Sequence, residues 1–231
     1  MSLPGGAAEP PRDCTLCPRL HDFIALWRQK QPDWFNAPVP TFVPPDGDAS
    51  VRLLIVGLAP GLRGANRTGR PFTGDYAGDL LYSTLIRFGL ARGQFDARVD
   101  DGLELVGTAI TNAVRCVPPD NKPDGSEINT CRRFLAATIA RFDNLEAILT
   151  LGTIAHQSTV RALGERVAAH PFGHGARTQI GRVALFSSYH CSRYNTNTGR
   201  LTAEMFVGVF GDVAEKLDLP ETRRARASPV P

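Results

Sequence analysis

Four short apolar runs, separated by longer amphipathic segments, constrain the fold of this chain more than any other feature. The runs lie at residues 53–56, 106–111, 147–151 and 183–186. Short apolar runs bounded by turn residues are typical of buried parallel strands. Helical patterns are found near residues 18–30, 75–88, 127–141, 153–164 and 199–218. Because strands that alternate with helices form βαβ units, the sequence predicts an α/β fold with the three layers of an α/β/α sandwich.

The length and composition of the chain are typical of one large globular domain. The chain has 231 residues, of which 42% are hydrophobic, enough to bury a substantial core. We expect a single domain over residues 13–219, with flexible tails at residues 1–12 and 220–231. No apolar run is long enough to span a membrane and no signal peptide pattern opens the sequence, which favours a cytoplasmic protein.

Four of the five cysteines form two pairs that a folded chain can bring together. Cys14 and Cys17 form a Cys-x-x-Cys motif near the N-terminus, and Cys116 and Cys131 follow much later. Four thiolates can hold a zinc ion or an iron–sulfur cluster, and their spacing alone does not separate the two. Because cytoplasmic cysteines stay reduced, metal binding is favoured over disulfides. Such a centre would tie the N-terminal arm to the body of the protein.

Polar segments follow the carboxyl ends of the predicted strands, where α/β proteins bind their ligands. The segment 57–75 contains five glycines, which permit close approach of the backbone to a ligand. Its arginines are candidates for phosphate contacts: Arg63, Arg67 and Arg70. Phe72 offers a stacking face, and the absence of a Gly-Lys-Ser/Thr sequence excludes the usual nucleotide triphosphate loop. The alternative for this segment is a flexible surface loop.

A histidine follows the last predicted strand. His190 lies directly after the strand end, beside Ser192, Arg193 and Asn195. A single histidine is commonly structural, but these polar neighbours at the ligand-binding edge favour a functional role.

Five motifs occur in an order that is specific to one enzyme family. They are Gly57-Leu58-Ala59-Pro60-Gly61, Gly69-Arg70-Pro71-Phe72-Thr73-Gly74-Asp75, Cys116-Val117-Pro118-Pro119, Ser188-Tyr189-His190 and Asn197-Thr198-Gly199-Arg200. With them, the chain resembles the uracil-DNA glycosylases, and specifically the family 5 branch found in bacteria and archaea. The resemblance extends from Cys14 to Leu217, nearly the whole chain.

The resemblance implies a central four-stranded parallel sheet and a structural [4Fe–4S] cluster. The cluster ligands map onto Cys14, Cys17, Cys116 and Cys131, with zinc as the alternative. The implied activity is hydrolysis of the N-glycosidic bond of uracil and other deaminated bases, hypoxanthine among them, in DNA during base excision repair. A bacterial or archaeal enzyme of this kind is expected in the cytoplasm, associated with the nucleoid.

Base excision requires a pocket for an extruded base, and several residues are candidates for binding it. Phe72 is the candidate stacking platform, with a core phenylalanine as the alternative. Asn112 aligns with an asparagine that reads the base edge in related families, because an amide offers both a donor and an acceptor. Its alternative role is in a turn or a helix cap. We expect the backbone of Gly57, Ala59 and Gly61 to border the same pocket.

Breaking the glycosidic bond leaves positive charge on the sugar and negative charge on the base, so fixed groups must face both. His190 can donate to a base oxygen. Many other families place a polar residue at the positions held here by Leu58 and Ala59, so the carboxylate must come from elsewhere. Asp75 is the candidate, with a helix N-cap as its alternative or additional role. Asn121 is a second, weaker candidate for aiding water or the base.

The segment after His190 is expected to contact DNA. Ser192 and Asn195 are expected to border the substrate, and Arg193 and Tyr194 to enter the minor groove and fill the space left by the extruded base. Cys191 stands where related families have proline, and is expected to be neither a nucleophile nor a metal ligand. None of the motifs contains a lysine, and Lys122 is the lysine nearest to them, so a Schiff-base lyase step is not expected.

Three functions remain open from the residues alone. The first is a monofunctional glycosylase acting on DNA as a monomer. The second is a cluster-bearing protein that binds nucleic acid without chemistry, and the third is a hydrolase of free nucleosides or nucleotides. The arginines of the segment 57–75 and the wedge at Arg193 and Tyr194 favour a polymer substrate.

Overall fold

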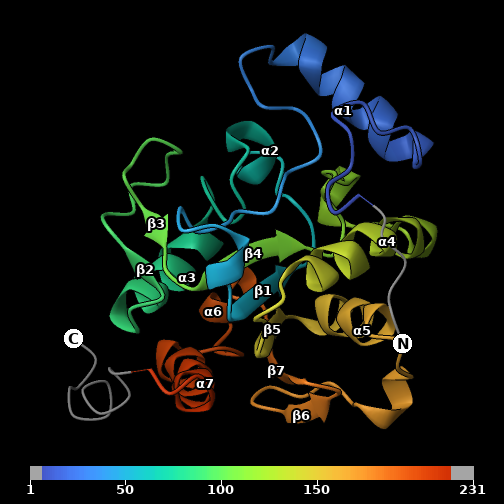
Figure 1. Ribbon diagram of the computed structural model, residues 1–231. Helices are drawn as coiled ribbons and strands as arrows, with labels where there is room; N and C mark the ends of the chain where they lie inside the picture. Colours follow the sequence, from blue (N-terminus) through green and yellow to red (C-terminus); the bar gives the residue numbers. More distant parts are fainter. Residues whose placement is uncertain (1–6, 220–231) are drawn as a thin grey trace.

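A five-stranded sheet forms the centre of the structure, a computed structural model that describes residues 7–219 (Figure 1). Four strands run parallel, in the order β4-β1-β5-β7. Their bounds are β1 Leu53–Gly57, β4 Thr108–Asn112, β5 Ala147–Leu151 and β7 Val183–Ser188. Every residue of these strands is buried, which is why their sequences are short apolar runs. The four predicted strands and the α/β fold are confirmed.

A fifth strand, β6 (Arg177–Ile180), extends the sheet beyond the predicted four. It pairs with β7 in the antiparallel direction. Only Ile180 in this strand is buried, because the strand lies at the edge of the sheet. The sequence therefore has no apolar run that marks it.

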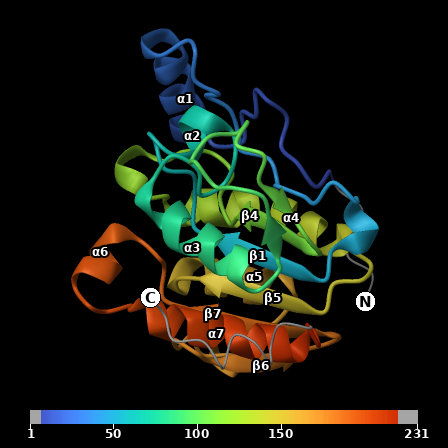
Figure 2. The same cartoon turned by 90° about the vertical axis from the view of Figure 1, so that its left-hand side faces the viewer.

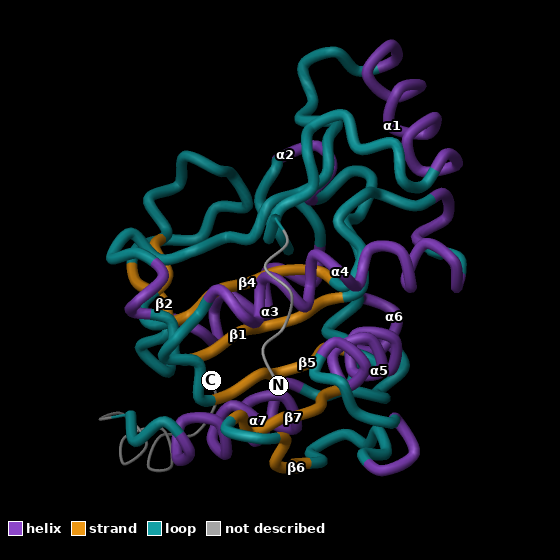
Figure 3. The backbone as a smooth tube through the Cα atoms, turned by 45° about the vertical axis from the view of Figure 1, so that its right-hand side comes forward, coloured by secondary structure: helices purple, strands orange, loops and turns teal. Residues whose placement is uncertain are grey.

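Helices cover both faces of the sheet, as the sandwich prediction required (Figures 1, 2 and 3). Alternate side chains of β1 point to opposite faces. Leu53 and Ile55 pack in one core with α3 and α7, and Leu54 and Val56 pack in a second core with α4 and α5. The covering helices are α3 Tyr76–Arg87, α7 Ala203–Lys216, α4 Gly125–Arg141 and α5 Thr153–Ala162.

The predicted helix over residues 199–218 begins later than expected. Its residues belong to α7, which starts after the cap residue Thr202, whose side chain accepts a hydrogen bond from the backbone N–H of Met205. A separate short helix, α6 (Arg193–Asn197), precedes it and is capped by Ser192. Gly199, with φ of 70°, ends the short helix, because a left-handed residue cannot continue an α-helix.

The N-terminal part of the chain forms a third small core at one end of the sheet. Helix α1 (Pro18–Lys30) confirms the predicted helix at 18–30 and lies beyond the sheet (Figure 1). Its residues Leu20 and Ile24 pack against Val114 and Phe134. Three short elements complete the fold: α2 (Ala65–Thr68), and strands β2 (Ala91–Arg92) and β3 (Glu104–Leu105), which form a two-stranded sheet.

The two tails fall mostly outside the described residues, which exclude residues 1–6 and 220–231. Within residues 7–12, Glu9 accepts a hydrogen bond from the buried Arg115 side chain at 2.8 Å. The expected division into one domain over 13–219 stays a prediction. Between residues 7 and 219, the structure has no helix with the length and apolar character that crossing a bilayer requires.

Candidate active site

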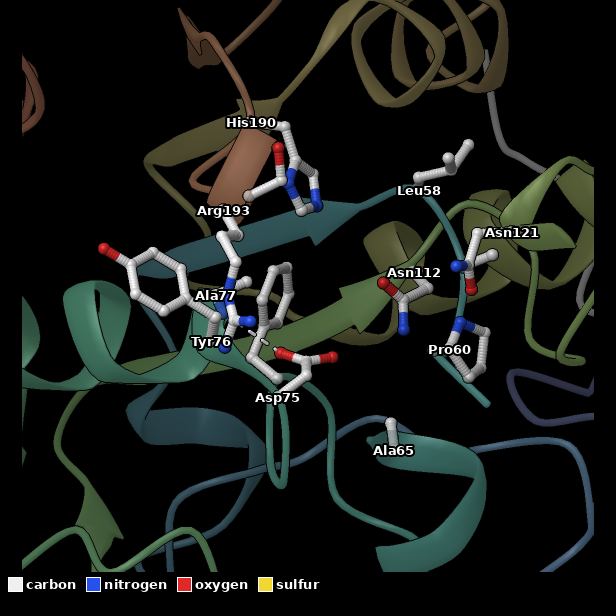
Figure 4. Close-up of a pocket in the computed structure, with 14 residues that line it drawn as sticks. Leu58, Pro60, Ala65, Asp75, Tyr76, Ala77, Asn112, Asn121, His190 and Arg193 are labelled. Carbon is white, nitrogen blue, oxygen red and sulfur yellow. Dashed lines mark hydrogen bonds between the residues drawn. The ribbon is translucent and has the colours of Figure 1, made fainter. Parts of the chain in front are cut away.

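A pocket of about 530 Å³ opens at the edge where the parallel strands end (Figure 4). It is built by the segments that follow β1, β4 and β7, because parallel strands place their carboxyl ends at the same edge. The predicted site residues that line it are Ala59, Gly61, Phe72, Asp75, Asn112, Asn121, His190, Ser192 and Arg193. The pocket is also lined by five residues that were not among the predicted site residues: Leu58, Pro60, Ala65, Tyr76 and Ala77.

Phe72 forms one wall of the pocket in an unusual backbone conformation. It is only 7% exposed, and its φ is 52°, in the left-handed region, which costs a phenylalanine roughly 1–3 kcal/mol. Its ring is stacked on that of His190, with centroids 5.8 Å apart and planes inclined by 27°. The Phe72 carbonyl lies so close to Gly78 of α3 that no side chain fits there. These contacts fix the ring, so Phe72 is at once buried and presented to the pocket.

Arg70 stabilises the segment around Phe72, and its guanidinium is not available for contacts with DNA phosphates. Its guanidinium forms two hydrogen bonds, of 2.9 and 2.6 Å, with the carboxylate of Asp101. Both side chains are buried, and Arg70 also donates to the Thr73 hydroxyl at 2.8 Å. The phosphate contact expected of Arg70 is therefore wrong, because its charge is already neutralised inside the fold. The pair holds the residues on either side of Phe72 in place.

Asn112 presents an unpaired amide to the pocket. It is the last residue of β4 and only 3% exposed. Among residues 7–219 no other side chain or backbone group makes a hydrogen bond with its amide, although buried polar groups normally have such a partner. Its donor and its acceptor are both free for a ligand, and Figure 4 shows the side chain pointing into the pocket. The helix-cap alternative for Asn112 does not fit this position.

Gly57 lies beneath the pocket and does not line it. It is paired with Asn112 across β1 and β4. A side chain at this position would collide with the Asn112 amide oxygen and would lie 2.6 Å from the Phe72 ring. The glycine is therefore what allows both groups to approach each other.

We expect Gly57→Ala to disable the site while the protein still folds. The added methyl group must displace Asn112 or Phe72, at a cost of about 1–3 kcal/mol in the free energy of unfolding. Base release measured at saturating DNA should fall steeply. Gly208→Ala is the matched control, because nothing lies within 4 Å of a side chain added in α7. Equal activity of the two variants would contradict this role of Gly57.

Asp75 is a helix N-cap, the alternative role that the sequence offered, and it also lines the pocket. It is the N-cap of α3, where its Oδ1 accepts a hydrogen bond from the backbone N–H of Ala77 at 3.2 Å. Its other oxygen lies against Gly61 and Gly64, where a side chain would touch it. Burial raises the pKa of the Asp75 carboxyl, and the N–H groups of Ala77 and Gly78 oppose this only in part. The carboxylate is thus held rigidly at the pocket wall with one oxygen free of the cap.

His190 faces Phe72 and is uncharged at neutral pH. Burial lowers the pKa of its imidazole to about 4, so the neutral ring can donate one hydrogen bond and accept another. Within the described chain the ring makes no hydrogen bond to protein. The side chain of Asn195 donates to the His190 carbonyl oxygen at 2.8 Å. Asn195 does not line the pocket, and the substrate contact expected of it stays a prediction.

The mouth of the pocket carries the predicted DNA-contacting residues. Arg193 lies over the ring of Tyr76, with its guanidinium carbon 5.2 Å from the ring centroid. Tyr194 is 73% exposed on α6, which projects from the body of the protein (Figure 2). Asn121 lines the opposite side, in the turn Pro119–Asn121, with φ of 56°. Tyr194 does not line the pocket, and its exposure fits a residue that enters DNA.

The fifth cysteine is buried in a different core from the other four. Cys191 is fully buried, and burial raises the pKa of its thiol to about 12. Its sulfur lies 3.4 Å from the carbonyl oxygen of Ala77, which links the segment after β7 to the start of α3. That it is neither a nucleophile nor a metal ligand stays a prediction.

The other four cysteines lie around one small cavity next to α1. Cys14, Cys17, Cys116 and Cys131 all line it, together with apolar side chains such as Leu20 and Phe134. Burial and the neighbouring thiols raise the pKa of Cys116, and burial raises that of Cys131. The backbone N–H of Arg115 donates to the Cys131 sulfur at 3.3 Å. The structure thus brings together the four residues that the sequence paired.

Two kinds of centre can be held by four cysteines: a zinc ion and a [4Fe–4S] cluster. A zinc site needs its sulfurs about 2.3 Å from a single point. Over the described range 7–219, no three Cys, His, Asp or Glu side chains are grouped so as to hold one metal ion. A [4Fe–4S] cluster binds each thiolate at a different iron. The four thiols line one cavity, and thiolates are ligands of both kinds of centre.

Comparison with known proteins agrees with this geometry. The model of the family described as the uracil DNA glycosylase superfamily matches residues 44–214. A type-5 uracil-DNA glycosylase from Thermus thermophilus is 42% identical over 207 residues, which cover 85% of this chain and 90% of the relative. A type-5 uracil-DNA glycosylase from Pyrobaculum aerophilum is 37% identical over 201 residues, with coverage of 85% and 86%. A type-4 uracil-DNA glycosylase from the same organism is 34% identical over 125 residues, which cover 54% of this chain and 56% of the relative. The chain therefore belongs to the uracil DNA glycosylase superfamily, in its type-5 branch.

Proposed function

We infer that this protein is a uracil-DNA glycosylase that hydrolyses the N-glycosidic bond of uracil in DNA during base excision repair. The observation that carries this inference is the convergence of four side chains on one pocket: Phe72, Asn112, Asp75 and His190. Together they supply a stacking face, an unpaired amide, a carboxylate and a neutral imidazole, which is the set that base excision requires.

The base is bound before the bond is broken. The target nucleotide leaves the duplex and its base lies on the ring of Phe72, where stacking contributes about 1–3 kcal/mol. The free amide of Asn112 pairs with the edge of the base, since it offers a donor and an acceptor. Because Asn112 is buried, a base that leaves its amide unpaired is rejected at a cost of about 1–3 kcal/mol.

Bond cleavage then develops charge on both fragments. The neutral imidazole of His190 donates a hydrogen bond to the base oxygen on which negative charge grows. The Asp75 carboxylate, negatively charged once deprotonated, stabilises the cationic sugar and orients the attacking water. Asn121, across the pocket, assists in holding that water or the base. The products are the free base and an abasic site.

The DNA strand stays intact in this reaction. A lyase step needs a lysine that forms a Schiff base with the sugar, and no lysine is among the residues that line the pocket. Arg193 and the exposed Tyr194 enter the minor groove and fill the space that the base has left. We expect the protein to act on DNA as a monomer and, in a bacterial or archaeal cell, in the cytoplasm near the nucleoid.

The substrate range extends to other deaminated bases, hypoxanthine among them. Two properties support this. The pocket has a volume of about 530 Å³, which leaves room for a two-ring base, and the residues after β1, Leu58 and Ala59, have no polar side chain that selects for uracil.

One assay separates the three functions that the sequence left open. The protein is incubated with labelled uracil-containing duplex DNA and the products are treated with alkali. Strand breaks that appear only after alkali support a monofunctional glycosylase. Binding without breaks supports a nucleic-acid-binding protein, and base release from free nucleosides alone supports a small-molecule hydrolase.

We also propose that Cys14, Cys17, Cys116 and Cys131 hold a structural [4Fe–4S] cluster. A bound cluster supplies no chemistry to base excision and instead ties residues 14–17 to α4 and to the segment after β4. The arrangement of the four thiols around one cavity supports this proposal.

Protein purified without oxygen should be brown and should absorb light at about 400 nm, as cysteine-bound iron–sulfur clusters do. Cys131→Ala should remove this absorbance and lower the melting temperature. Cys191→Ala is the matched control and should keep the absorbance, since Cys191 is buried elsewhere in the protein. A colourless protein with one zinc ion per chain would contradict the cluster and support the alternative.

A further inference from the structure

The orientation of His190 depends on its backbone. Its imidazole has no hydrogen-bond partner among residues 7–219, and its only ring contact there is the stack with Phe72. Without such a partner, the direction of the ring is set by its Cα–Cβ bond, by the rotamer it adopts and by its stack on Phe72. A group that holds the turn of residues 188–190 therefore helps to set the direction of the imidazole toward the base.

One side chain from a different segment holds this turn. His174, in the connection that precedes β6, accepts a hydrogen bond at its Nδ1 from the backbone N–H of Tyr189, with the nitrogens 3.3 Å apart. The Ser188 hydroxyl lies 3.3 Å from the same nitrogen. The His174 ring also stacks on the Tyr189 ring, with centroids 5.1 Å apart and planes inclined by 19°. The turn is thus held both through its backbone and through a side chain.

The hydrogen bond to Tyr189 requires one form of His174. A backbone N–H can only donate, so Nδ1 must be unprotonated and the ring must carry its proton on Nε2. Burial lowers the pKa of His174, an effect that the Met205 backbone partly opposes, which favours this neutral form. The cationic ring would place an N–H against an N–H and would lose the contact.

We propose that His174 is a positioning residue for the reaction: by accepting the Tyr189 N–H, it sets the backbone from which His190 reaches the base. The inference rests on the proposed glycosylase activity. Asn195, which donates to the His190 carbonyl, holds the other side of the same turn. His174 lies in the chain between α5 and β6, away from every motif that identified the family, and it does not line the pocket.

Two substitutions separate the hydrogen bond from the bulk of the side chain. The oxygen of an asparagine can take the place of Nδ1, whereas the amide of a glutamine lies farther out, near the place of Nε2. We therefore expect His174→Gln to lower the single-turnover rate of base release roughly 10- to 100-fold, the size expected of a small misplacement of a catalytic group. His174→Asn should restore most of that loss, and the affinity for uracil-containing DNA should be unchanged in both.

The decisive readout is the coupling with His190. A residue that acts only through His190 has no further effect once that ring is gone. His174→Gln should therefore reduce the rate in the wild-type protein and leave the rate of His190→Ala unchanged. His170→Gln is the control, because the His170 ring bonds to Thr178 of β6 at 3.0 Å and not to the turn. His174→Met replaces the glutamine variant if the latter does not fold.

Three results would overturn the proposal. They are a wild-type rate in His174→Gln, an equal loss with and without the His190 imidazole, and an equal loss in His170→Gln. Failure of the proposed function has a different signature, because the wild-type protein itself would then release no base.

Discussion

Asp75→Asn should lower the single-turnover rate of uracil release by about 10²- to 10⁴-fold, the contribution expected of a group that orients water and stabilises charge at the sugar. Asparagine is a good N-cap residue, so α3 should keep its start and the melting temperature should change little. DNA affinity should also be preserved, since Asp75 faces the sugar and not the phosphates. The measurement is base release from labelled duplex at saturating protein.

The pH dependence of the same reaction identifies the carboxylate. The reaction needs ionised Asp75, and its pKa is raised, so the rate should fall on the acid side at a higher pH than an ordinary aspartate would give. The pKa of His190 is about 4, so the pH profile of Asp75→Asn is needed to separate its protonation from that of Asp75. The residual rate of Asp75→Asn should lack this acid limb.

The matched control for Asp75→Asn is Asp124→Asn, at the N-cap of α4. Asp124 does not line the pocket, so this variant should act at the wild-type rate. If Asp75→Asn were as active as Asp124→Asn, Asp75 would be a helix cap and nothing more.

Asp101→Asn should lower the free energy of unfolding by about 3–5 kcal/mol, because it leaves the Arg70 guanidinium buried without a counter-charge. Arg70 also lies over the rings of Phe42, Tyr82 and Phe95, which cannot replace a carboxylate. The rate of base release should also fall, since Arg70 stabilises the residues beside Phe72 in the active site. Urea unfolding measures the stability, and base release on the folded fraction measures the second effect.

The sign of the pH effect follows from the pKa of Asp101. Burial alone would raise this pKa, but the Arg70 side chain and the N–H groups of Leu103 and Asp96 lower it well below its usual range. The stabilisation is therefore complete above the unfolded pKa of about 3.9 and is lost as the pH falls through the folded pKa. The difference between wild type and Asp101→Asn should shrink in acid.

Asp100→Asn provides the comparison for Asp101→Asn at the neighbouring position. Asp100 pairs with Arg98 in solvent, where both side chains are more than half exposed, and such pairs contribute little. Its removal should leave the urea midpoint unchanged. Equal unfolding curves for the two variants would show that the buried pair does not stabilise this fold.

The sequence was sufficient for the parts of the fold in which burial leaves a pattern. The parallel strands are buried on both faces and read as apolar runs, and the helices α1, α3, α4 and α5 were each anticipated. Strand β6 could not be predicted, because an edge strand with one buried residue has no such pattern. Helices α2 and α6 are too short to show a helical period.

The sequence predicted the site residues that follow the ends of strands. It did not predict the contacts between segments that are distant in the sequence. Phe72, Asp75, Asn112 and His190 converge because the parallel sheet brings their segments to one edge. Arg70 was wrongly assigned to phosphate contacts because its partner Asp101 is 31 residues away in the sequence. No local sequence pattern predicts this ion pair. The positioning role of His174 has no sequence signal either, since it depends on how the connection before β6 folds back on the end of β7.

The most direct test of the account is the structure of Asp75→Asn bound to a duplex that contains uracil. We expect the uracil to lie outside the helix, with its ring against Phe72 and its edge at the amide of Asn112, and with Tyr194 in the gap left in the duplex. A uracil that remains stacked in the duplex, or that is bound away from this pocket, would contradict the central claim that these residues form the site of base excision.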